Sequence, residues 1–198
     1  MESLYTITHI AASLNWELHQ FDIKTAFLNG ILPEDEQAFM EQPEGFEVPR
    51  KEDWVLHLLK SIYGMKQASR VWNTTFNNEV MSWGFLCLPC EWCIYYRSSP
   101  FGTVIFSVHV DDIFAAASSA EELKSFKALL QKKWKISDLG PTHFVLGIAI
   151  NHNCPSCSIS LSQTAYIDRL LIHPFSSTYH HHLPRELVGS RPLFRVPL

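Results

Sequence analysis

Apolar residues recur along this chain with two different periods, and the two periods alternate. A spacing of three to four residues, typical of one apolar helix face, marks four stretches. These predicted helices span residues 3–14, 67–83, 120–133 and 163–171. Short apolar or alternating runs between them predict strands at residues 16–23, 54–59, 94–97, 103–110, 113–117, 144–150 and 158–161. The pattern therefore predicts a fold that mixes amphipathic helices with short strands.

Proline, glycine and serine residues mark where these elements begin and end. Three prolines and one glycine follow the first strand and predict a long connection with little regular structure. They are Pro33, Pro43, Gly45 and Pro49. Ser119 with Glu122 matches a capping box at a helix start, and Gly84 is a candidate helix stop. Ser162 is a candidate cap for the last predicted helix.

Composition indicates a globular protein without a membrane span. The chain has 198 residues, of which 46% are hydrophobic and 18% charged, enough for one domain or two closely packed subdomains. No apolar run approaches the length of about 18 residues that a spanning helix needs. The N-terminus lacks a basic segment before an apolar one, so no secretory signal is indicated and an intracellular location is expected.

The net charge of −4 argues mildly against tight, unaided binding to nucleic acid, because nucleic-acid binders are usually basic. Positive charge is local instead. Lys60, Lys66 and Arg70 form one group, and five lysines between residues 124 and 135 form another. The second group is also explained by the solvated face of a helix.

Five cysteines leave two interpretations open. Cys87, Cys90 and Cys93 follow one another at steps of three, and Cys154 pairs with Cys157 at the same spacing. An odd number without a signal sequence argues against a disulfide framework. Zinc binding is the first interpretation, although no matching His or acid completes a site. The second, which we favour, is that they are small buried thiols.

Two acidic strand ends carry the strongest chemical signal. Asp111 and Asp112 follow the apolar run 104–110, and Asp22 ends the run 16–21. Ionised carboxylates beside packed apolar residues need a cation or hydrogen bonds. The alternatives are a solvated turn and a divalent-metal site at a hairpin tip. Strand alternation predicts that Asp111 shares a face with His109, and Asp112 with Val110.

Six motifs occur in order and together resemble the reverse transcriptase of copia-type LTR retrotransposons. They are QFDIKTAFLNG (20–30), MEQPEGF (40–46), SIYGMKQASRVW (61–72), VHVDDI (108–113), DLGPTHFVLGIAI (138–150) and LSQTAYIDRLL (161–171). Each motif is weak alone, but the ordered set covers residues from about 15 to 171.

The resemblance implies a fold, a reaction and a metal site. The fold is the palm of a right-hand polymerase, of the α+β class, with an antiparallel sheet backed by helices, partial fingers and an incomplete thumb. The reaction is DNA synthesis on a primed RNA or DNA template from deoxynucleoside triphosphates, with two Mg²⁺ ions, or Mn²⁺ as an alternative. Asp22 and Asp111 are then the principal metal ligands and catalytic residues, and Asp112 is the third, less direct acid.

The resemblance also implies a nucleotide pocket. Phe27 is expected to exclude a ribose 2′-hydroxyl, although it also fits a core position after a strand. Tyr63 and Gly64 are expected at the pocket floor, where glycine permits close backbone approach. Lys66 and Arg70 are expected to meet phosphate, although both also fit the exposed first turn of a helix.

Two positions depart from the pattern. The acid pair is preceded by His109-Val110 where the family has Tyr-Val, and this position faces the primer end in the family. A histidine there can still donate a hydrogen bond, and its charge varies near neutral pH. Ser69 stands where a proline is usual, which we expect to be a mild change.

The resemblance predicts two parts within this chain, and it also predicts family segments that lie outside it. Residues 1–171 are expected to form the palm with partial fingers and the start of the thumb, and residues 172–198 a divergent, flexible tail. The rest of the fingers, the thumb and RNase H would be partners from a larger polyprotein, and we expect the isolated chain to be weakly active or inactive. The rival hypotheses are a non-catalytic relic that binds nucleic acid or a partner, a zinc-stabilised module and a metal-dependent nuclease.

Overall fold

A computed structural model describes residues 2–153 and 156–172. A six-stranded antiparallel sheet organises the chain, in the strand order β4-β5-β6-β7-β1-β8. Its strands are β1 (Glu17–Ile23), β4 (Leu86–Leu88), β5 (Glu91–Ser99), β6 (Gly102–His109), β7 (Asp112–Ala117) and β8 (Ile136–Pro141). The central strand β7 therefore pairs with β6, its neighbour in sequence, and with β1, which is far from it in sequence.

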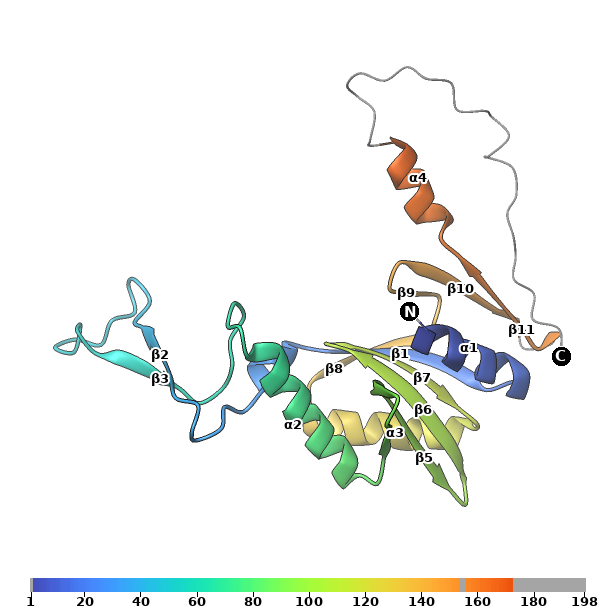
Figure 1. The fold of residues 1–198 in the computed structure, drawn as a ribbon, viewed down its shortest axis with the longest axis horizontal. Coiled ribbons are helices and arrows are strands. Elements are labelled where there is room, and N and C mark those ends of the chain that lie inside the picture. Colours follow the sequence, from blue (N-terminus) through green and yellow to red (C-terminus); the bar gives the residue numbers. More distant parts are fainter. Residues whose placement is uncertain (1, 154–155, 173–198) are drawn as a thin grey trace.

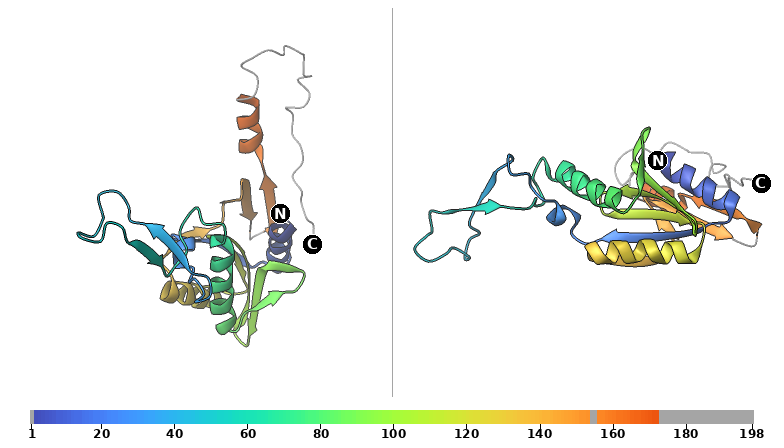
Figure 2. Two further views of the ribbon diagram at one scale, coloured as in Figure 1. Left: turned by 60° about the vertical axis from the view of Figure 1, so that its left-hand side comes forward. Right: turned by 90° about the horizontal axis from the view of Figure 1, so that it is seen from below.

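Helices cover both faces of this sheet, so both faces bury apolar side chains. Helix α1 (Glu2–Leu14) lies against one face, and α3 (Ala120–Lys133) lies against the other (Figure 1; Figure 2, right). Helix α2 (Ala68–Ser82) packs into the same hydrophobic cluster as α3. The alternation of β-strand side chains sends odd-numbered residues of β7 to the α2 and α3 side and Phe114 and Ala116 to the α1 side.

The larger core is built from aromatic rings around Phe106. This side chain is fully buried, and its ring centroid lies 4.7 Å from that of Phe126 and 5.2 Å from that of Tyr95. Phe85 and Phe76 approach it edge-on at 5.3 and 6.3 Å. Such offset and edge-on pairs are the preferred arrangements of aromatic rings, so α2, α3 and the sheet are joined by a well-packed layer.

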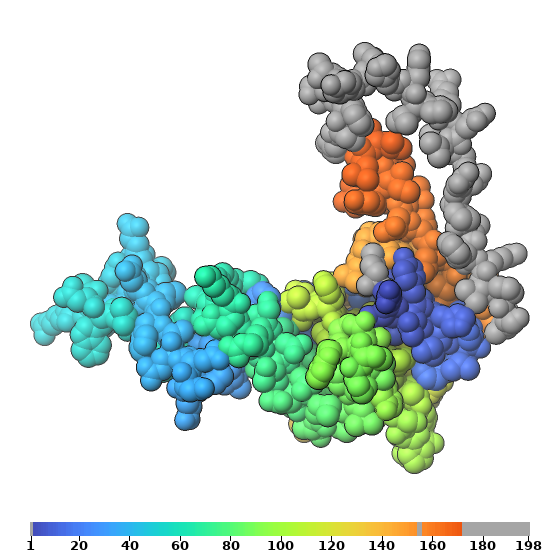
Figure 3. All heavy atoms as spheres, in the orientation of Figure 1, coloured from blue at the N-terminus to red at the C-terminus, as the bar shows by residue number. Residues whose placement is uncertain are grey.

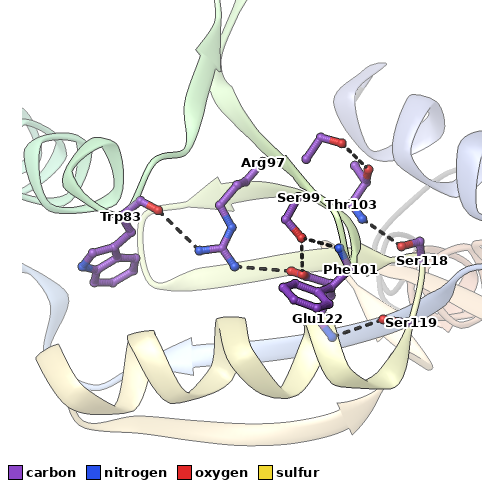
Figure 4. A network of polar contacts seen from close by, with 9 residues as sticks. Trp83, Arg97, Ser99, Phe101, Thr103, Ser118, Ser119 and Glu122 are labelled. Carbon is purple, nitrogen blue, oxygen red and sulfur yellow. Dashed lines mark hydrogen bonds and ion pairs between the residues drawn. The ribbon is translucent and has the colours of Figure 1, made fainter.

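A buried polar contact ties the start of α3 to the sheet. Glu122 is almost fully buried, and its carboxylate accepts hydrogen bonds from Ser99 Oγ at 2.6 Å and Arg97 Nη2 at 3.4 Å (Figure 4). The guanidinium of Arg97 also lies over the ring of Phe85 at 4.6 Å. The charge of Arg97 and the hydroxyl of Ser99 offset the desolvation of Glu122, and these contacts fix α3 on the sheet.

Two smaller sheets lie outside the main one. Strands β9 (Phe144–Val145), β10 (Ile148–Asn153) and β11 (Ser158–Ser162) form a three-stranded sheet beside α1, and α4 (Thr164–Ile172) follows it. Strands β2 (Ala38–Glu41) and β3 (Val55–Leu58) form an arm that projects from the main sheet (Figures 1 and 3). We call residues 33–59 the β2–β3 arm.

The predicted helices are confirmed within one residue at every end, and Ser119 accepts a hydrogen bond from the Glu122 N–H as expected of a cap. Ser162 Oγ accepts one from the Thr164 N–H. Strands β2, β4 and β8 were not predicted, and the predicted strand 144–150 is split by a turn at Leu146 and Gly147, both with positive φ. A short 3₁₀ helix η1 (Ala26–Asn29) was also missed.

The coarse fold class is confirmed as a mixture of helices with antiparallel sheets. The predicted tail falls almost entirely outside the described residues. Within the described part of the chain, no helix has the length and apolar character that crossing a membrane requires.

Candidate functional site

The acids predicted from the strand ends lie side by side. In the pairing of β1 with β7, Asp22 stands directly opposite Asp112. A two-residue turn, Val110-Asp111, joins strands β6 and β7. Asp111 is therefore adjacent to the strand ends that carry Asp22 and Asp112. The sheet register therefore brings Asp22 to two adjacent acids that lie about 90 residues later in the sequence.

One face assignment from the sequence is wrong. His109 pairs directly with Asp112, and directly opposed residues of an antiparallel pair project from the same face. Asp112 therefore shares a face with His109 and Asp22, rather than with Val110. The tight turn causes the difference, because strand alternation does not continue through Val110 and Asp111. Gln20, two residues before Asp22, donates from Nε2 to Asp112 Oδ1 at 3.4 Å.

Two hydrogen bonds hold the turn in place. The Ile23 N–H donates to the Asp111 carbonyl at 2.8 Å, which joins the turn to β1. The Trp72 indole Nε1 donates to the Val110 carbonyl at 2.7 Å, which joins it to α2. Val110 has a φ of 60°, a conformation that a β-branched residue rarely adopts. The surroundings therefore hold the acidic turn in a strained geometry.

Asp22 has a positive partner, Lys24, just after the end of its strand. Its Oδ2 atom is buried and accepts no hydrogen bond from the described residues, but Lys24 Nζ lies 2.5 Å away as an ion pair outside hydrogen-bond geometry. Across the described residues, no group of three or more His, Cys, Asp or Glu side chains is arranged to hold a metal ion. The acids are thus neighbours in the sheet without forming a closed ligand cage.

The predicted nucleotide pocket is partly assembled. The Phe27 ring is half-buried on η1, and its centroid lies 5.2 Å from that of Tyr63, whose side chain is exposed. Ser61 Oγ donates to the Phe27 carbonyl at 2.5 Å and fixes η1. Gly64 has a φ of 93°, which glycine adopts readily. Phe27 and Tyr63 are therefore neighbours, with Gly64 next to Tyr63 in sequence, and their role in a nucleotide pocket stays a prediction.

A cavity of about 370 Å³ lies between this pocket and the acidic turn. Phe27, Arg70 and Val110 contribute to its wall, so the cavity connects η1, α2 and the turn. The remaining lining residues are Ser69, Trp72, Asn73, Phe76 and Val108. Tyr63, Lys66 and His109 are not among them.

The two predicted phosphate contacts differ in their surroundings. Lys66 is exposed. Arg70 is also exposed, but its Nη2 donates to both carboxylate oxygens of Glu36 at 2.5 Å. This hydrogen bond and the charge of Glu36 raise the pKa of Arg70 above its usual value. Arg70 therefore remains charged but has a carboxylate partner from the base of the β2–β3 arm.

The cysteines show no metal-binding arrangement among the described residues. Burial raises the pKa of the Cys87 and Cys93 thiols, so both are held in the neutral form, whereas Cys90 is exposed. Burial and both thiols raise the pKa of the neighbouring Tyr95 to about 12. Cys154 lies outside the described residues. The expectation of buried thiols is therefore wrong for Cys90 and met only in part by Cys87, Cys93 and Cys157, which are half-buried.

Three residues of the site were missed from sequence. Trp72 holds the turn, Gln20 contacts Asp112 and Lys24 pairs with Asp22. Strand alternation offered a signal for two of them, because Gln20 and Lys24 lie two residues either side of Asp22 and so share its face. The sequence gave no signal that Trp72 holds the turn, because its indole also belongs to an apolar stripe of α2.

One known protein family matches most of the chain. A family profile described as reverse transcriptase (RNA-dependent DNA polymerase) matches residues 1–184. The chain therefore belongs to the reverse transcriptase family, which confirms the predicted resemblance.

The relatives are proteins of transposons. The chain is 40% identical over 172 residues to the retrovirus-related Pol polyprotein from transposon TNT 1-94 of Nicotiana tabacum. It is 35% identical over 175 residues to the putative transposon Ty5-1 protein of Saccharomyces cerevisiae, and 30% over 169 residues to the Pol polyprotein from transposon RE1 of Arabidopsis thaliana.

These matches cover 85–88% of this chain but only 13%, 56% and 11% of the three relatives. No solved structure matches the chain significantly.

Proposed function

We propose that this chain is the polymerase palm of a copia-type retrotransposon reverse transcriptase, with part of the fingers and the start of the thumb. Its reaction would be template-directed DNA synthesis. The observation that carries the proposal is the register of β1 with β7, which sets Asp22 opposite Asp112 beside the turn at Asp111. A solvated loop explains one acid pair, but not a third acid paired across the sheet.

The donor set of these acids suits a hard divalent cation, because Mg²⁺ prefers carboxylate oxygens. Asp22 Oδ2, which is buried and accepts no hydrogen bond from residues 2–153 and 156–172, is the clearest candidate ligand atom. Asp111 and Asp112 would supply the other carboxylates. Bound Mg²⁺ or Mn²⁺ would activate the primer hydroxyl and offset the charge of the triphosphate.

The chain's own residues would position the substrates around that centre. Phe27, supported by Tyr63, would stand under the sugar and exclude a ribose 2′-hydroxyl by contact. Gly64 would let the backbone approach the nucleotide, and His109 would contact the primer end. Lys66 and Arg70 would meet phosphate, which requires Arg70 to exchange its Glu36 partner.

The partners follow from the same proposal. They are an RNA or DNA template with its primer, deoxynucleoside triphosphates, and the rest of the fingers, the thumb and RNase H from a polyprotein. The short share of each Pol relative that the chain spans supports the polyprotein context. Without those segments we expect weak synthesis or none.

Primer extension on a primed RNA template tests the reaction. We expect low, Mg²⁺-dependent incorporation that is lost in Asp22→Asn and Asp111→Asn. Glu121→Gln is the control, because Glu121 is an exposed acid at the start of α3, beyond the opposite end of β7. Incorporation that survives Asp111→Asn would refute the assignment. In the same assay, Phe27→Ala should increase the use of ribonucleotides.

A melting measurement tests the metal site even when synthesis is undetectable. A cation that binds only the folded chain raises its melting temperature. We expect Mn²⁺ to do so for the wild type and for Glu121→Gln but not for Asp22→Asn. An equal rise in all three proteins would exclude Asp22 as a ligand.

One observation favours a second function, a non-catalytic relic that binds nucleic acid. The buried oxygen of Asp22 already pairs with Lys24, and the described residues contain no closed ligand group. Binding to a primed template that weakens with salt, with no extension in Mg²⁺ or Mn²⁺, would support the relic.

A further inference from the structure

The side chain of Lys24 is the unexpected neighbour of the acidic site. Its Nζ lies 2.5 Å from Asp22 Oδ2, the oxygen that is buried and accepts no hydrogen bond from the described residues. The Asp22 side chain is 24% exposed and that of Lys24 is 49% exposed. The ammonium therefore covers the oxygen that the proposed function assigns to a metal ion.

A hydrogen bond fixes the backbone of Lys24 beside Asp22, while its side chain can move away from the carboxylate. The Lys24 N–H donates to the Lys135 carbonyl at 2.9 Å, which extends the pairing of β1 with β8 by one residue. Residues two apart on an extended strand share a face, so Lys24 projects on the side of Asp22. Its flexible four-carbon stem, half exposed, allows the ammonium to swing into solvent.

The balance of charge around the site explains why a cation is needed there. Asp22 and Asp112 are opposed across the sheet, and Asp111 lies in the adjoining turn. Among the described residues, Lys24 forms the ion pair with this group, while Asp112 receives an amide hydrogen bond from Gln20. Like charges this close repel strongly where solvent screens them poorly, so the empty acidic group would destabilise the sheet.

We propose that Lys24 is a built-in counter-ion, which neutralises Asp22 when no divalent cation is bound and withdraws from Oδ2 when one binds. This inference rests on the proposed metal site. Lys24 then has two linked effects: it stabilises the metal-free chain, and it weakens cation binding because the cation must displace it. A lysine that merely decorated the surface would have neither effect.

Calorimetric titration of the whole chain with Mn²⁺ tests the competition directly. Lys24→Met keeps the aliphatic stem and removes the charge, so we expect binding at least about tenfold tighter than in the wild type. Lys24→Arg keeps the charge and should bind close to the wild type. Without metal, Lys24→Met should melt at a lower temperature than the wild type, and added Mn²⁺ should raise that temperature more.

Asp22→Asn separates failure of this inference from failure of the proposed function, with Glu121→Gln, an exposed acid at the start of α3, as the control. Unchanged Mn²⁺ affinity in Asp22→Asn would remove Asp22 from the metal site and so overturn both proposals. Weakened binding in Asp22→Asn, with Lys24→Met no tighter than the wild type, would overturn the counter-ion alone.

Whether the variants fold is an independent test of the counter-ion role of Lys24. If Lys24→Met does not fold, the double variant with Asp22→Asn should, because no acid charge then needs a partner at that position. Circular dichroism measures this rescue. A double variant that also fails to fold would assign Lys24 a packing role and overturn the proposal.

Discussion

The six-stranded sheet and the β2–β3 arm differ in how far they bury their apolar side chains. The sheet buries them on both faces, and Phe106 is fully inaccessible to solvent. The arm leaves them exposed: Phe46 is 81% exposed and Trp54 is 62% exposed. Because a lone two-stranded hairpin is marginally stable at best, the arm depends on its connections rather than on a core. The acidic site is built on the sheet, and the arm contributes Glu36, which pairs with Arg70 of α2.

Polar contacts replace apolar packing inside the arm. Gln42 Nε2 donates to the carbonyls of Lys51 and Trp54 at 2.6 and 2.8 Å, and its Oε1 accepts from the Val48 N–H at 2.8 Å. One amide side chain thus closes the loop between β2 and β3. The two regions should therefore respond very differently to substitution.

The largest effect is expected in the aromatic core. Phe106→Ala removes a ring that contacts Phe126 and Tyr95, and should lower the free energy of unfolding by about 3–5 kcal/mol. Phe46→Ala in the arm is the matched control and should change it by less than about 0.5 kcal/mol. Urea denaturation followed by circular dichroism measures both. Equal losses would show that the arm has a core of its own.

A smaller effect is expected where the sheet holds the acidic turn. Trp72→Phe keeps the ring in the core but leaves the Val110 carbonyl without its donor, at a cost of about 1–3 kcal/mol. Primer extension should fall by a larger factor than stability explains, because the turn carries Asp111. Trp92→Phe, at an exposed site, is the control. If both variants keep full extension, the indole does not position the turn.

The sheet and the arm should also differ in how their carboxylates make the stability of the protein depend on pH. Burial alone would raise the pKa of Asp138 in β8, but hydrogen bonds from Lys127 and the Gly140 N–H outweigh it and lower the pKa overall. A lowered pKa favours the folded state above the pKa of the unfolded chain, and this stability disappears as pH falls through the folded value. Asp138→Asn should therefore cost at most about 1 kcal/mol near pH 7, and nothing in strong acid.

Glu52 in the arm is the comparison for this titration. Backbone N–H groups of Glu52 and Arg50 also lower its pKa, but its carboxylate is exposed in the arm. Glu52→Gln should leave the global melting temperature unchanged at every pH. Melting temperatures measured between pH 2 and 8 test this difference. If Glu52→Gln changed them with pH in the same way as Asp138→Asn, the expected difference between arm and sheet would be wrong.

The smallest effect on global stability is expected for Gln42→Ala. Loss of its hydrogen bonds should open the loop of the arm while changing the free energy of unfolding by less than about 0.5 kcal/mol. Limited proteolysis should then cleave residues 43–53 faster than in the wild type or in Gln37→Ala. Unchanged cleavage would mean that other contacts hold the loop.

The sequence predicted the parts of this fold that depend on periodicity or on known motifs. Helical spacing located all four described helices, and the acids at two strand ends indicated a shared site before any register was known. Strands β4 and β8 were missed because they are short or irregular, and β8 contains Asp138, Gly140 and Pro141. Their strand character comes from pairing with neighbours, which local pattern does not contain.

The site was predicted less completely than the fold. Residue types at motif positions pointed to Asp22, Phe27 and Arg70, but not to the partners that modify them. Glu36 lies 34 residues before Arg70, and only the folded chain brings them together. The face of Asp112 was assigned wrongly because a two-residue turn resets the alternation of side chains.

The left-handed conformation of Val110 also has an evolutionary consequence. A side chain in such a strained conformation costs about 1–3 kcal/mol, which a glycine would avoid. Selection for folding alone would thus favour a glycine codon at this position, whereas selection for a stiff hairpin beneath Asp111 would oppose it. Copies of the element released from the need to replicate would be free to drift toward the more relaxed backbone.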